Sequence, residues 1–434
     1  MRNFSKVCLL AIVLALGIGE AFGQFGWTRD PRNPIPLGGS WNLNNGNPCV
    51  LFNADSSRYE MWFNGWPGIP GPHGDFYPHY VGFAHSRDGI NWTVYPSAVL
   101  APTSGAWDAY TVDQPVVIRE NGHYKMWYSS YYYVPPTYPN YIGYATSPDG
   151  IQWTKYAGNP VMGLGTAVWD AAGPYTCAVI PFPGGYRMWY AGYDTSGGNS
   201  TIGYATSSDG ITWQRDTVHN PVLKHGPPSQ WDSAGIWSPQ VLRIKNTYYM
   251  WYAGSRGSGN QMVECIGVAT SKDTGITWTT YTGNPAFLPS SGGWDGGLVM
   301  PGSVLLRGDT LDMWYTGIRP PYNTYLMYIG HATTLVTAIT ERRQEVPQDF
   351  MLLQNYPNPF NPGTTIKYEL PRASLVSLQV YDILGREVSV LVNERKDPGV
   401  HEVSFDGSNL ASGVYFYRLQ TENFVSSKKF ILMK

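Results

Sequence analysis

The chain has 434 residues and a formal net charge of −2. Aromatic residues make up 15% and charged residues only 14%, with 49 Gly and 34 Pro; so many turn formers favour a fold of many short strands. The balanced charge excludes a broad basic surface, so we expect no nucleic-acid partner.

Residues 1–23 are predicted to be a signal peptide. Arg2 and Lys6 give a positive start, residues 7–18 form an apolar run, and residues 21–23 form a small-x-small cleavage site. The apolar run is too short to span a bilayer. No other apolar run in the sequence is long enough, so we expect the exported chain to have no membrane span.

Residues 24–334 contain one stretch that is repeated five times. Each copy has a Met-Trp-Tyr or Met-Trp-Phe core, and the copies follow one another every 62 to 65 residues. The core tryptophans are Trp62, Trp127, Trp189, Trp251 and Trp314. A fixed period of this length indicates repeated supersecondary units.

Each copy is predicted to form four short strands, because alternating apolar positions are separated by Gly, Asn, Asp and Pro. In the third copy we expect the strands near residues 175–180, 186–192, 201–207 and 212–215. Four antiparallel strands, repeated radially, make the blades of a β-propeller. The sequence therefore predicts an all-β chain that begins with a five-bladed β-propeller.

The third and fourth strands of four copies are joined by Ser-x-Asp-Gly-Ile-x-Trp, which is one residue longer in the fourth copy. These turns carry Asp88, Asp149, Asp209 and Asp273. They resemble the Asp-box turn of sialidase-type propellers. The local requirement is an Asp that caps backbone N–H groups, a Gly with positive φ, and a Trp that packs under the next hairpin.

The two ends of the repeat predict how the ring closes. Residues Trp27–Leu37 resemble the end of a copy, whereas the fifth copy stops after its third strand, at Ile329–Thr333. We therefore expect Trp27–Asp30 to pair beside Ile329–Thr333 as the fourth strand of the fifth blade. That closure would leave no open sheet edge between the first and last blades.

Cysteine usage does not indicate a disulfide framework. Cys8 lies in the predicted signal peptide, and Cys49, Cys177 and Cys265 lie in the first, third and fourth copies. The blades that carry Cys49 and Cys177 are not neighbours. We therefore expect three free and mostly buried thiols.

Residues 335–349 break the period and are predicted to be a linker. Residues 350–434 follow as a second domain, whose alternating segments favour a small Ig-like β-sandwich. Its opening Tyr-Pro-Asn-Pro-Phe-Asn-Pro, at Tyr356–Pro362, and the segments after it resemble the type A C-terminal sorting domain of type IX secretion. The resemblance implies that the type IX secretion machinery is a partner and that the protein is secreted or held at the cell surface. The alternative is an adhesive Ig-like module.

Functional residues are expected where the repeat is broken, at one mouth of the ring. A Trp-Asp pair precedes the first strand in four copies, with Trp41 and Asn42 as the variant in the first copy, so we interpret this pair as structural. Six residues after these tryptophans the copies all differ, with Asn47, Asp113, Tyr175, Trp237 and Met300. Asp113 is the one carboxylate among them and is the candidate catalytic residue.

Long loops between the second and third strands of blades 5, 1 and 2 are predicted to wall a groove. The candidate substrate-binding residues are Asn47, Tyr175, Trp237, Trp66, Asp75, Tyr132 and Tyr325. Aromatic faces beside Asn, Asp and His suit sugar rings, which have an apolar C–H face and a rim of hydroxyls. The alternative is that these aromatic residues pack the loops onto each other.

The first of these loops also holds His73, Asp75 and His79, but their spacing matches no strong metal-binding motif. The sequence contains no P-loop, dinucleotide fingerprint or Ser-His-Asp signature. We therefore predict no metal site and no cofactor.

Over roughly Trp27–Thr333 the repeat resembles the five-bladed glycoside hydrolases of families 43, 32 and 68. The resemblance implies an Asp base or nucleophile in blade 1, a supporting Asp in blade 2 and a Glu acid in blade 3. Position by position, these roles fall on Asn47, Asp113 and Ala172. Two of the three carboxylates are absent, although hydrolysis normally needs two carboxyl groups. Substitutes would have to come from Asp75, Asp108, Asp170, Asp194 or Glu264.

Three hypotheses for the function follow. The protein is a glycosidase with a displaced acid and base, a glycan-binding propeller without catalysis, or a surface scaffold or protein-binding propeller. Two groove carboxylates roughly 5–10 Å apart would favour the first, and an aromatic groove without such a pair the second. A flat, closed mouth would favour the third. We favour a carbohydrate-directed function with a glycan or polysaccharide partner, and leave hydrolysis open.

Overall fold

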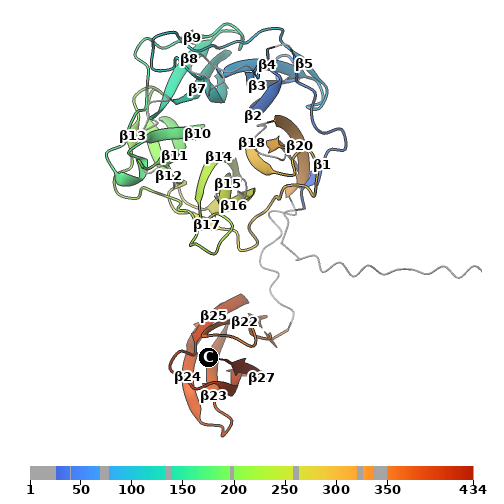
Figure 1. The fold of residues 1–434 in the computed structure, drawn as a ribbon, viewed down its shortest axis with the longest axis vertical. Helices are drawn as coiled ribbons and strands as arrows, with labels where there is room; N and C mark the ends of the chain where they lie inside the picture. Colours follow the sequence, from blue (N-terminus) through green and yellow to red (C-terminus); the bar gives the residue numbers. More distant parts are fainter. Residues whose placement is uncertain are drawn as a thin grey trace, which may run out of the picture. The chain divides into compact units, whose positions relative to one another are not determined.

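The computed structural model describes residues 26–39, 41–68, 78–131, 139–195, 200–257, 263–319, 326–336 and 349–433. The chain divides into two compact units, residues 1–336 and 337–434. Both are built from β-strands, and the first is a ring of five blades (Figure 1). Among the described residues, no helix is long and apolar enough to cross a membrane. The predicted signal peptide lies outside the described residues.

Each blade is an antiparallel sheet, and in blades 1 to 4 the strands follow one another in chain order; Figure 1 shows first strands such as β10 and β14 nearest the centre of the ring. Blade 1 holds β2 (Asn44–Asn53), β3 (Arg58–Trp66), β4 (Tyr80–Ser86) and β5 (Trp92–Val94). Blade 2 holds β6 (Asp113–Glu120), β7 (His123–Tyr131), β8 (Asn140–Ser147) and β9 (Thr154–Lys155). Blade 3 holds β10 (Gly173–Phe182), β11 (Gly185–Tyr193), β12 (Ser200–Ser207) and β13 (Gln214–Arg215), after the short turn η1 (Val168–Asp170).

Blade 4 holds β14 (Gly235–Ile244), β15 (Thr247–Arg256), β16 (Val263–Ser271) and β17 (Thr279–Thr280). Blade 5 holds β18 (Leu298–Arg307), β19 (Thr310–Ile318) and β20 (Met327–Leu335), and its fourth strand is β1 (Thr28–Arg29). The predicted five-bladed propeller is therefore confirmed.

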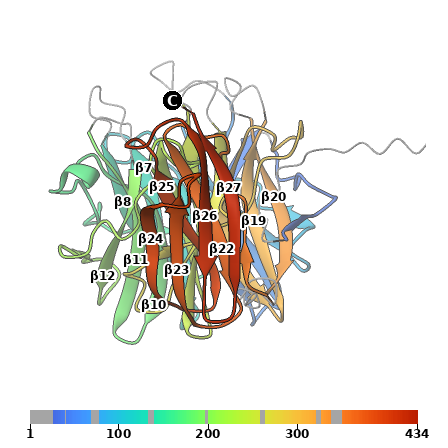
Figure 2. The same ribbon diagram turned by 90° about the horizontal axis from the view of Figure 1, so that it is seen from below.

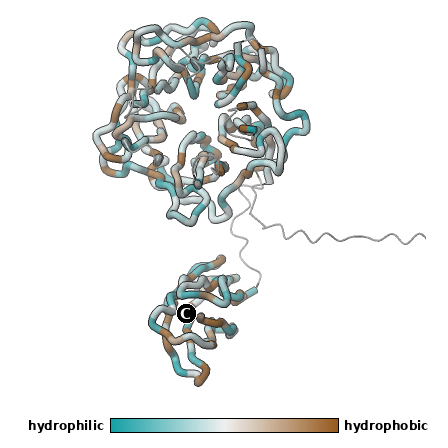
Figure 3. Tube along the Cα trace, in the orientation of Figure 1, coloured by the Kyte–Doolittle hydropathy of each residue, from teal (hydrophilic) through white to brown (hydrophobic). Residues whose placement is uncertain are grey.

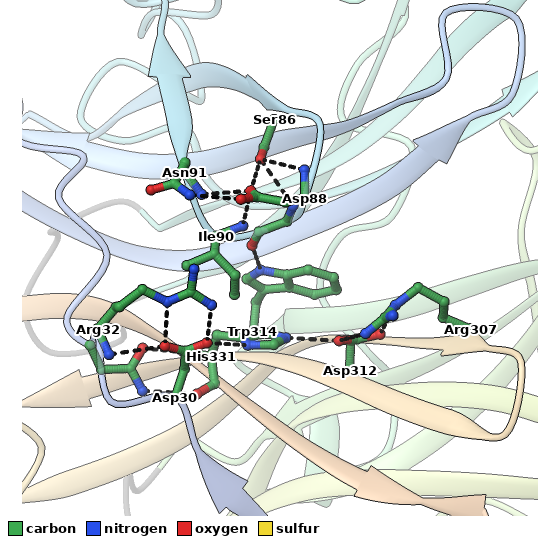
Figure 4. Close-up of polar contacts among 12 residues, drawn as sticks. Asp30, Arg32, Ser86, Asp88, Ile90, Asn91, Arg307, Asp312, Trp314 and His331 are labelled. Carbon is green, nitrogen blue, oxygen red and sulfur yellow. Dashed lines mark hydrogen bonds and ion pairs between the residues drawn. The ribbon is translucent and has the colours of Figure 1, made fainter.

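The N-terminal strand closes the ring as the sequence predicts. In β1, Thr28 pairs with Thr333 and Arg29 with Ala332 of β20, and the N–H of Asp30 donates to the carbonyl of His331 at 2.9 Å. Figure 4 shows the buried His331 ring between two carboxylates, with Nε2 2.9 Å from Asp312 Oδ1 and Nδ1 3.7 Å from Asp30 Oδ2. Charged groups from the two ends of the ring thus lie together at the closing seam.

The core tryptophans connect each blade to the next. Trp62 donates its Nε1–H to the Gly150 carbonyl in the Asp-box turn of blade 2 at 2.8 Å. The same bond joins Trp127 to Gly210, Trp189 to Gly275, and Trp314 to Gly89. Blade 5 has no Asp-box turn, and there the buried Nε1 of Trp251 has no hydrogen-bond partner within the described part of the chain. Trp27 packs edge-on against Trp251 instead, with 6.5 Å between ring centroids.

The Asp-box turns are locally capped, as predicted. In blade 3, Asp209 Oδ1 accepts backbone N–H groups of Ile211 and Thr212 at 2.8 and 2.7 Å, and Gly210 has a φ of 81°. These backbone hydrogen bonds lower the pKa of Asp209 to about 2. The turn's Trp213 packs edge-on against Trp127 of the preceding blade at 6.2 Å. Each turn therefore supports a seam between blades.

The C-terminal unit is an Ig-like arrangement of two sheets, and Figure 2 shows its strands side by side. One sheet holds β21 (Met351–Leu352), β22 (Gly363–Leu370) and β25 (Gly399–Asp406). The other holds β24 (Glu387–Lys396), β23 (Ser374–Tyr381), β26 (Gly413–Gln420) and β27 (Val425–Leu432). The C-terminal unit has its own hydrophobic core between the sheets, which includes Tyr368, Leu378, Tyr417 and Phe430. In both units the hydropathy changes every few residues along the chain (Figure 3), as expected for strands with one buried face.

Candidate functional site

The first strand of each blade is irregular near the mouth of the ring. The register shifts between Asp113 and Val116 in blade 2, and comparable shifts occur in the first strands of the other four blades. Asn47, Gln114 and Ser238 take left-handed backbone conformations there, with φ between 48° and 50°. Such bulges redirect side chains away from the regular sheet pattern.

Neighbouring blades hold these bulges in place. The N–H of Gln114 donates to Asn64 Oδ1 of blade 1 at 2.8 Å, and the N–H of Asn47 donates to Thr316 Oγ1 of blade 5 at 2.7 Å. Both acceptors lie two residues after the core tryptophan of their own blade. The backbone at the mouth is therefore fixed by side chains that differ between blades.

Asp113 is the centre of a buried polar cluster drawn from three blades. Its side chain is 2% exposed. Its Oδ2 lies 3.0 Å from Nδ1 of His79, which precedes β4 of blade 1, and accepts the Tyr175 hydroxyl of blade 3 at 3.4 Å. Its Oδ1 accepts the N–H of Gln114 at 2.8 Å. The carboxylate is therefore oriented before any ligand arrives.

Aromatic rings surround this carboxylate. Trp66 stacks on the His79 ring, with 4.5 Å between centroids and 20° between planes. Tyr131 lies edge-on to both His79 and Tyr175, at 6.2 and 6.0 Å, and Tyr193 lies edge-on to Tyr175 at 6.0 Å. We call Trp66, His79, Tyr131, Tyr175 and Tyr193 the aromatic arc.

Burial, followed by the charge of Asp113, raises the pKa of both Tyr131 and Tyr175. Burial likewise raises the pKa of Tyr193. These phenols therefore keep their protons at neutral pH and act as hydrogen-bond donors.

A second buried carboxyl group belongs to blade 4. Glu264, near the start of β16, is 2% exposed, and its Oε1 has no hydrogen-bond partner within the described residues. Burial raises its pKa well above the ordinary value, although a hydrogen bond from the Trp237 side chain acts in the opposite direction. Burial raises the pKa of Tyr193, and the negative charge of Glu264 adds to that shift. For Glu264 itself, burial favours the protonated form.

The predicted site residues meet different outcomes. The structure brings Asp113 and Tyr175 together, and Trp66 joins them by stacking on His79. Trp237 instead forms a hydrogen bond with Glu264. The candidates Asp75, Tyr132 and Tyr325 lie outside the described residues, together with His73 and most of the predicted loop groove.

The position-by-position comparison needs a correction in blade 1. Gly46 pairs with Asn64 across the sheet, as Asp113 pairs with Ser129, and both partners lie two residues after a core tryptophan. Asn47 therefore corresponds to Gln114 and not to Asp113. Counting from the preceding tryptophan overshoots by one residue, because the approach to the first strand is one residue shorter in blade 1.

Asn47 and Ala172 have structural surroundings of their own. Asn47 borders a narrow cavity near the bulges, together with Gln114, Thr176 and Gln240, and its Oδ1 has no partner among the described residues. The carbonyl of Ala172 accepts a hydrogen bond from the backbone N–H of Asn140 at 2.8 Å, and the N–H of Ala172 donates to the backbone carbonyl of Tyr193 at 2.9 Å. Asp108 and Asp170 form ion pairs with Lys155 and Arg215.

Two members of the cluster were not identified in this role from the sequence. The sequence places His79 in a candidate metal-binding set with His73 and Asp75, which lie outside the described residues. Tyr193 lies four residues after its core tryptophan. The equivalent positions hold Trp66, Tyr131, Tyr193, Ser255 and Ile318. Comparing this position between copies would have located the arc.

Several solved structures that align with the propeller are described as glycoside hydrolases or phosphorylases. A glycoside hydrolase aligns with a TM-score of 0.56 at 17% identity, over 70% of this chain and 92% of that one. A β-1,2-mannobiose phosphorylase from Listeria innocua aligns with a TM-score of 0.55 at 14% identity, over 73% and 99%. A thermostable family-43 glycoside hydrolase aligns with a TM-score of 0.50 at 20% identity, over 66% and 88%. At these identities the likeness shows the fold alone.

Two family matches cover separate parts of the sequence. Residues 177–296 match the N-terminal domain of glycosyl hydrolases family 32, and residues 354–433 match the secretion system C-terminal sorting domain. The C-terminal unit is a type IX secretion sorting domain. The chain is accordingly directed to the cell surface or the extracellular space, as the sequence predicts.

Curated relatives match a shorter segment. Proteins from two strains of Mycobacterium tuberculosis, both described as uncharacterized, are 31% and 29% identical over 180 residues. Each match covers 40% of this chain and 56% of the relative. The chain therefore spans about half the length of the curated relatives it matches.

Proposed function

We propose that the propeller binds a glycan at its central mouth, with Asp113 as the main polar contact. The observation that carries this proposal is the buried cluster of Asp113, His79 and Tyr175, which comes from three blades at the point where the repeat is broken. The fold, shared with carbohydrate-active propellers, supports the same class of ligand.

The chemistry of the cluster fits a sugar. A carboxylate accepts hydrogen bonds from hydroxyl groups, and each such charge-assisted hydrogen bond contributes about 1.5–3 kcal/mol. The half-buried rings of Tyr131 and Tyr175 provide apolar surface near that carboxylate, which would match the C–H face of a pyranose, while the buried Trp66 stacks on His79. One oriented carboxylate beside aromatic surface is the usual composition of a small-molecule site.

The test is a glycan array followed by calorimetric titration of the best ligand. β-1,2-Mannosides belong in the first set of ligands, because one solved structure of this fold is a β-1,2-mannobiose phosphorylase. The Asp113→Asn variant, which keeps the shape but removes the charge, should bind its glycan about ten-fold or more weakly. Asp209→Asn, in an Asp-box turn at the opposite end of the blades, is the matched control and should bind normally. Normal binding by Asp113→Asn would contradict the proposal.

Glu264 favours glycoside cleavage as a second candidate function. Hydrolysis uses one protonated and one ionised carboxyl group, and environments that separate two such groups identify acid and base. Burial raises the pKa of Glu264 and so favours its protonated form, whereas Asp113 accepts hydrogen bonds from the Gln114 N–H and the Tyr175 hydroxyl. Glu264 would then donate a proton to the leaving oxygen.

A turnover assay separates the two functions. If the wild-type protein cleaves the bound glycan, Glu264→Gln should lower kcat about 100-fold or more, because the amide cannot donate the proton, and should leave glycan affinity unchanged. Unchanged turnover in Glu264→Gln would exclude this residue as the acid. Binding without any turnover by the wild-type protein would leave the glycan-binding function alone.

A further inference from the structure

The Asp of the Trp-Asp pair is buried in four blades, and three of these four are neutralised from within the blade. Lys155, Arg215 and Arg29 lie 2.5, 3.1 and 2.8 Å from Asp108, Asp170 and Asp295. All three cations occupy the same place in the fourth strand, opposite Ala145, Ala205 and Ala332. Each also lies 5.6 to 5.9 Å from the ring centroid of the second-strand tyrosine, which is Tyr128, Tyr190 or Tyr315.

Blade 1 shows what happens when the charges are lost together. The Asp is replaced by Asn42, and the cation position opposite Ala84 holds Val94. The tyrosine position holds Phe63, on which Trp41 stacks. In this blade, therefore, both charged residues are replaced by uncharged ones, and the tyrosine is replaced by a phenylalanine.

Blade 4 keeps the carboxylate and the tyrosine but has no cation. The fourth-strand position opposite Ala269 is Thr280. Asp232 is 5% exposed, and its Oδ1 accepts the N–H of Gly226 at 3.2 Å. Throughout the described residues, no Lys or Arg forms an ion pair with it. His225 is near enough to act on Asp232 electrostatically, but its Nδ1 lies 3.0 Å from the Gly226 carbonyl.

The missing cation changes the state of the carboxyl group. Burial raises the pKa of Asp232 above its ordinary value. Asp295 is buried too, yet hydrogen bonds from Ser290 and Arg29 outweigh that burial and lower its pKa. A buried carboxylate without a counter-ion is unfavourable, and binding a cation would relieve this cost.

A cavity lies beside Asp232. Its volume is about 340 Å3, and Asp232, Tyr252, Thr280 and Asn284 are among the residues that line it. The corresponding cavity in blade 3, about 270 Å3, is lined by both Asp170 and Arg215. The same space therefore holds a carboxylate with its own cation in blade 3 and a carboxylate alone in blade 4.

We propose that the blade 4 cavity binds a small organic cation, a primary ammonium or a guanidinium, in the place that Lys or Arg takes in the other blades. Asp232 supplies the negative charge, and the ring of Tyr252 supplies the cation–π surface that each of the other cations uses. The volume falls within the range of small-molecule pockets. A calcium ion would instead require six or more oxygen ligands, and one carboxylate beside an aromatic ring is a poor match.

The test uses agmatine, which carries both an ammonium and a guanidinium group, on the full exported chain. Binding is measured by calorimetry and by the shift in Tm at constant ionic strength. Thr280→Arg places the cation on the protein, so it should raise the Tm without ligand and weaken agmatine binding about ten-fold or more. Asp232→Asn should weaken binding by a similar factor, and Asn42 shows that a blade can fold with Asn at this position.

Thr279→Arg is the matched control, because it adds the same charge at the neighbouring residue on the other side of the strand. This variant should bind agmatine as the wild-type protein does. The proposal is overturned if agmatine does not bind, if Thr280→Arg binds it as tightly as the wild-type protein, or if only calcium binds. The outcome is independent of glycan binding, because the cavity shares no residue with the Asp113 cluster.

Discussion

The two ends of the propeller blades differ in how strictly they keep the repeat. At the end that carries the Asp-box turns, four blades use the same Asp, Gly and Trp, and the same Trp-to-Gly hydrogen bond joins neighbouring blades. At the mouth, five equivalent positions hold five different environments, and Asp113 alone collects His79 and Tyr175. A seam must be made at every blade, so its residues recur. A ligand is held at one place, so its residues need not recur.

Exceptions to the repeat are therefore informative at both ends. Blade 5 lacks an Asp-box turn because its third and fourth strands, β20 and β1, are far apart in the sequence and no turn joins them; the buried Nε1 of Trp251 has no partner within the described residues. Blade 4 lacks the cation that would face Asp232. The following predictions test whether recurring residues support the fold and non-recurring residues support binding.

The largest effect is expected from opening the ring. Deleting residues 24–37 removes β1, the Arg29–Asp295 ion pair and the buried side chains of Trp27, Ile35 and Leu37. The loss of a buried charge partner and three core side chains should lower the free energy of unfolding by more than about 5 kcal/mol. Chemical denaturation of this variant, and of a control that lacks only residues 24–26, measures the difference. Equal stability of the two proteins would show that the N-terminal strand does not close the ring.

An intermediate effect is expected at the tryptophan seams. Trp189→Phe removes the donor to the Gly275 carbonyl, whereas Trp251→Phe removes an N–H that has no partner among the described residues. Both changes lose similar packing, so Trp189→Phe should cost about 1 kcal/mol more, which is the value of one net hydrogen bond. Thermal unfolding compares the two variants. A greater loss in Trp251→Phe would contradict the assigned role of these hydrogen bonds.

The smallest effect is expected from acid. Backbone hydrogen bonds lower the pKa of Asp209 to about 2. Burial acts to raise the pKa of Asp273, but hydrogen bonds from Ser271, Thr277 and backbone N–H groups outweigh it and lower that pKa to about 2 as well. An unfolded Asp has a pKa of about 3.9. The stabilisation is therefore fully present above about pH 4 and is lost as the pH falls toward 2. Tm measured against pH should show this decline, and Asp209→Asn should show a shallower one. An identical decline in the variant would mean that these turns do not contribute to acid sensitivity.

The sequence predicts most of the fold because the residues that each blade needs recur in several copies of the repeat. The period, the Asp-box turns and the split final copy together predict the five blades and the pairing of Trp27–Asp30 beside Ile329–Thr333. The sorting domain is likewise marked by its opening motif at Tyr356–Pro362.

The site is harder to predict, because its residues meet across blades. Asp113 stands out as the only carboxylate at its repeat position. Its contact with His79, however, depends on a bridge between His79, just before β4, and Thr111 of the next blade. Counting six residues from Trp41 matches Asn47 to Asp113, but the correct match in blade 1 is Gly46, because the segment before the strand is one residue shorter there. The raised pKa of Glu264 follows from burial, which no local pattern in the sequence reveals.

The most direct test of the account compares Asp113→Ala with Asp170→Ala in two measurements, glycan affinity by calorimetry and Tm. Asp113→Ala should weaken glycan binding roughly ten-fold to a hundred-fold, at about 1.4 kcal/mol per ten-fold, and should lower the Tm less than Asp170→Ala does. Asp170→Ala removes the partner of Arg215, so it should lower stability by about 3 kcal/mol and leave the affinity of the folded protein unchanged. If Asp113→Ala instead binds the glycan normally while losing stability, Asp113 is a residue of the fold and the mouth of the ring is not the binding site.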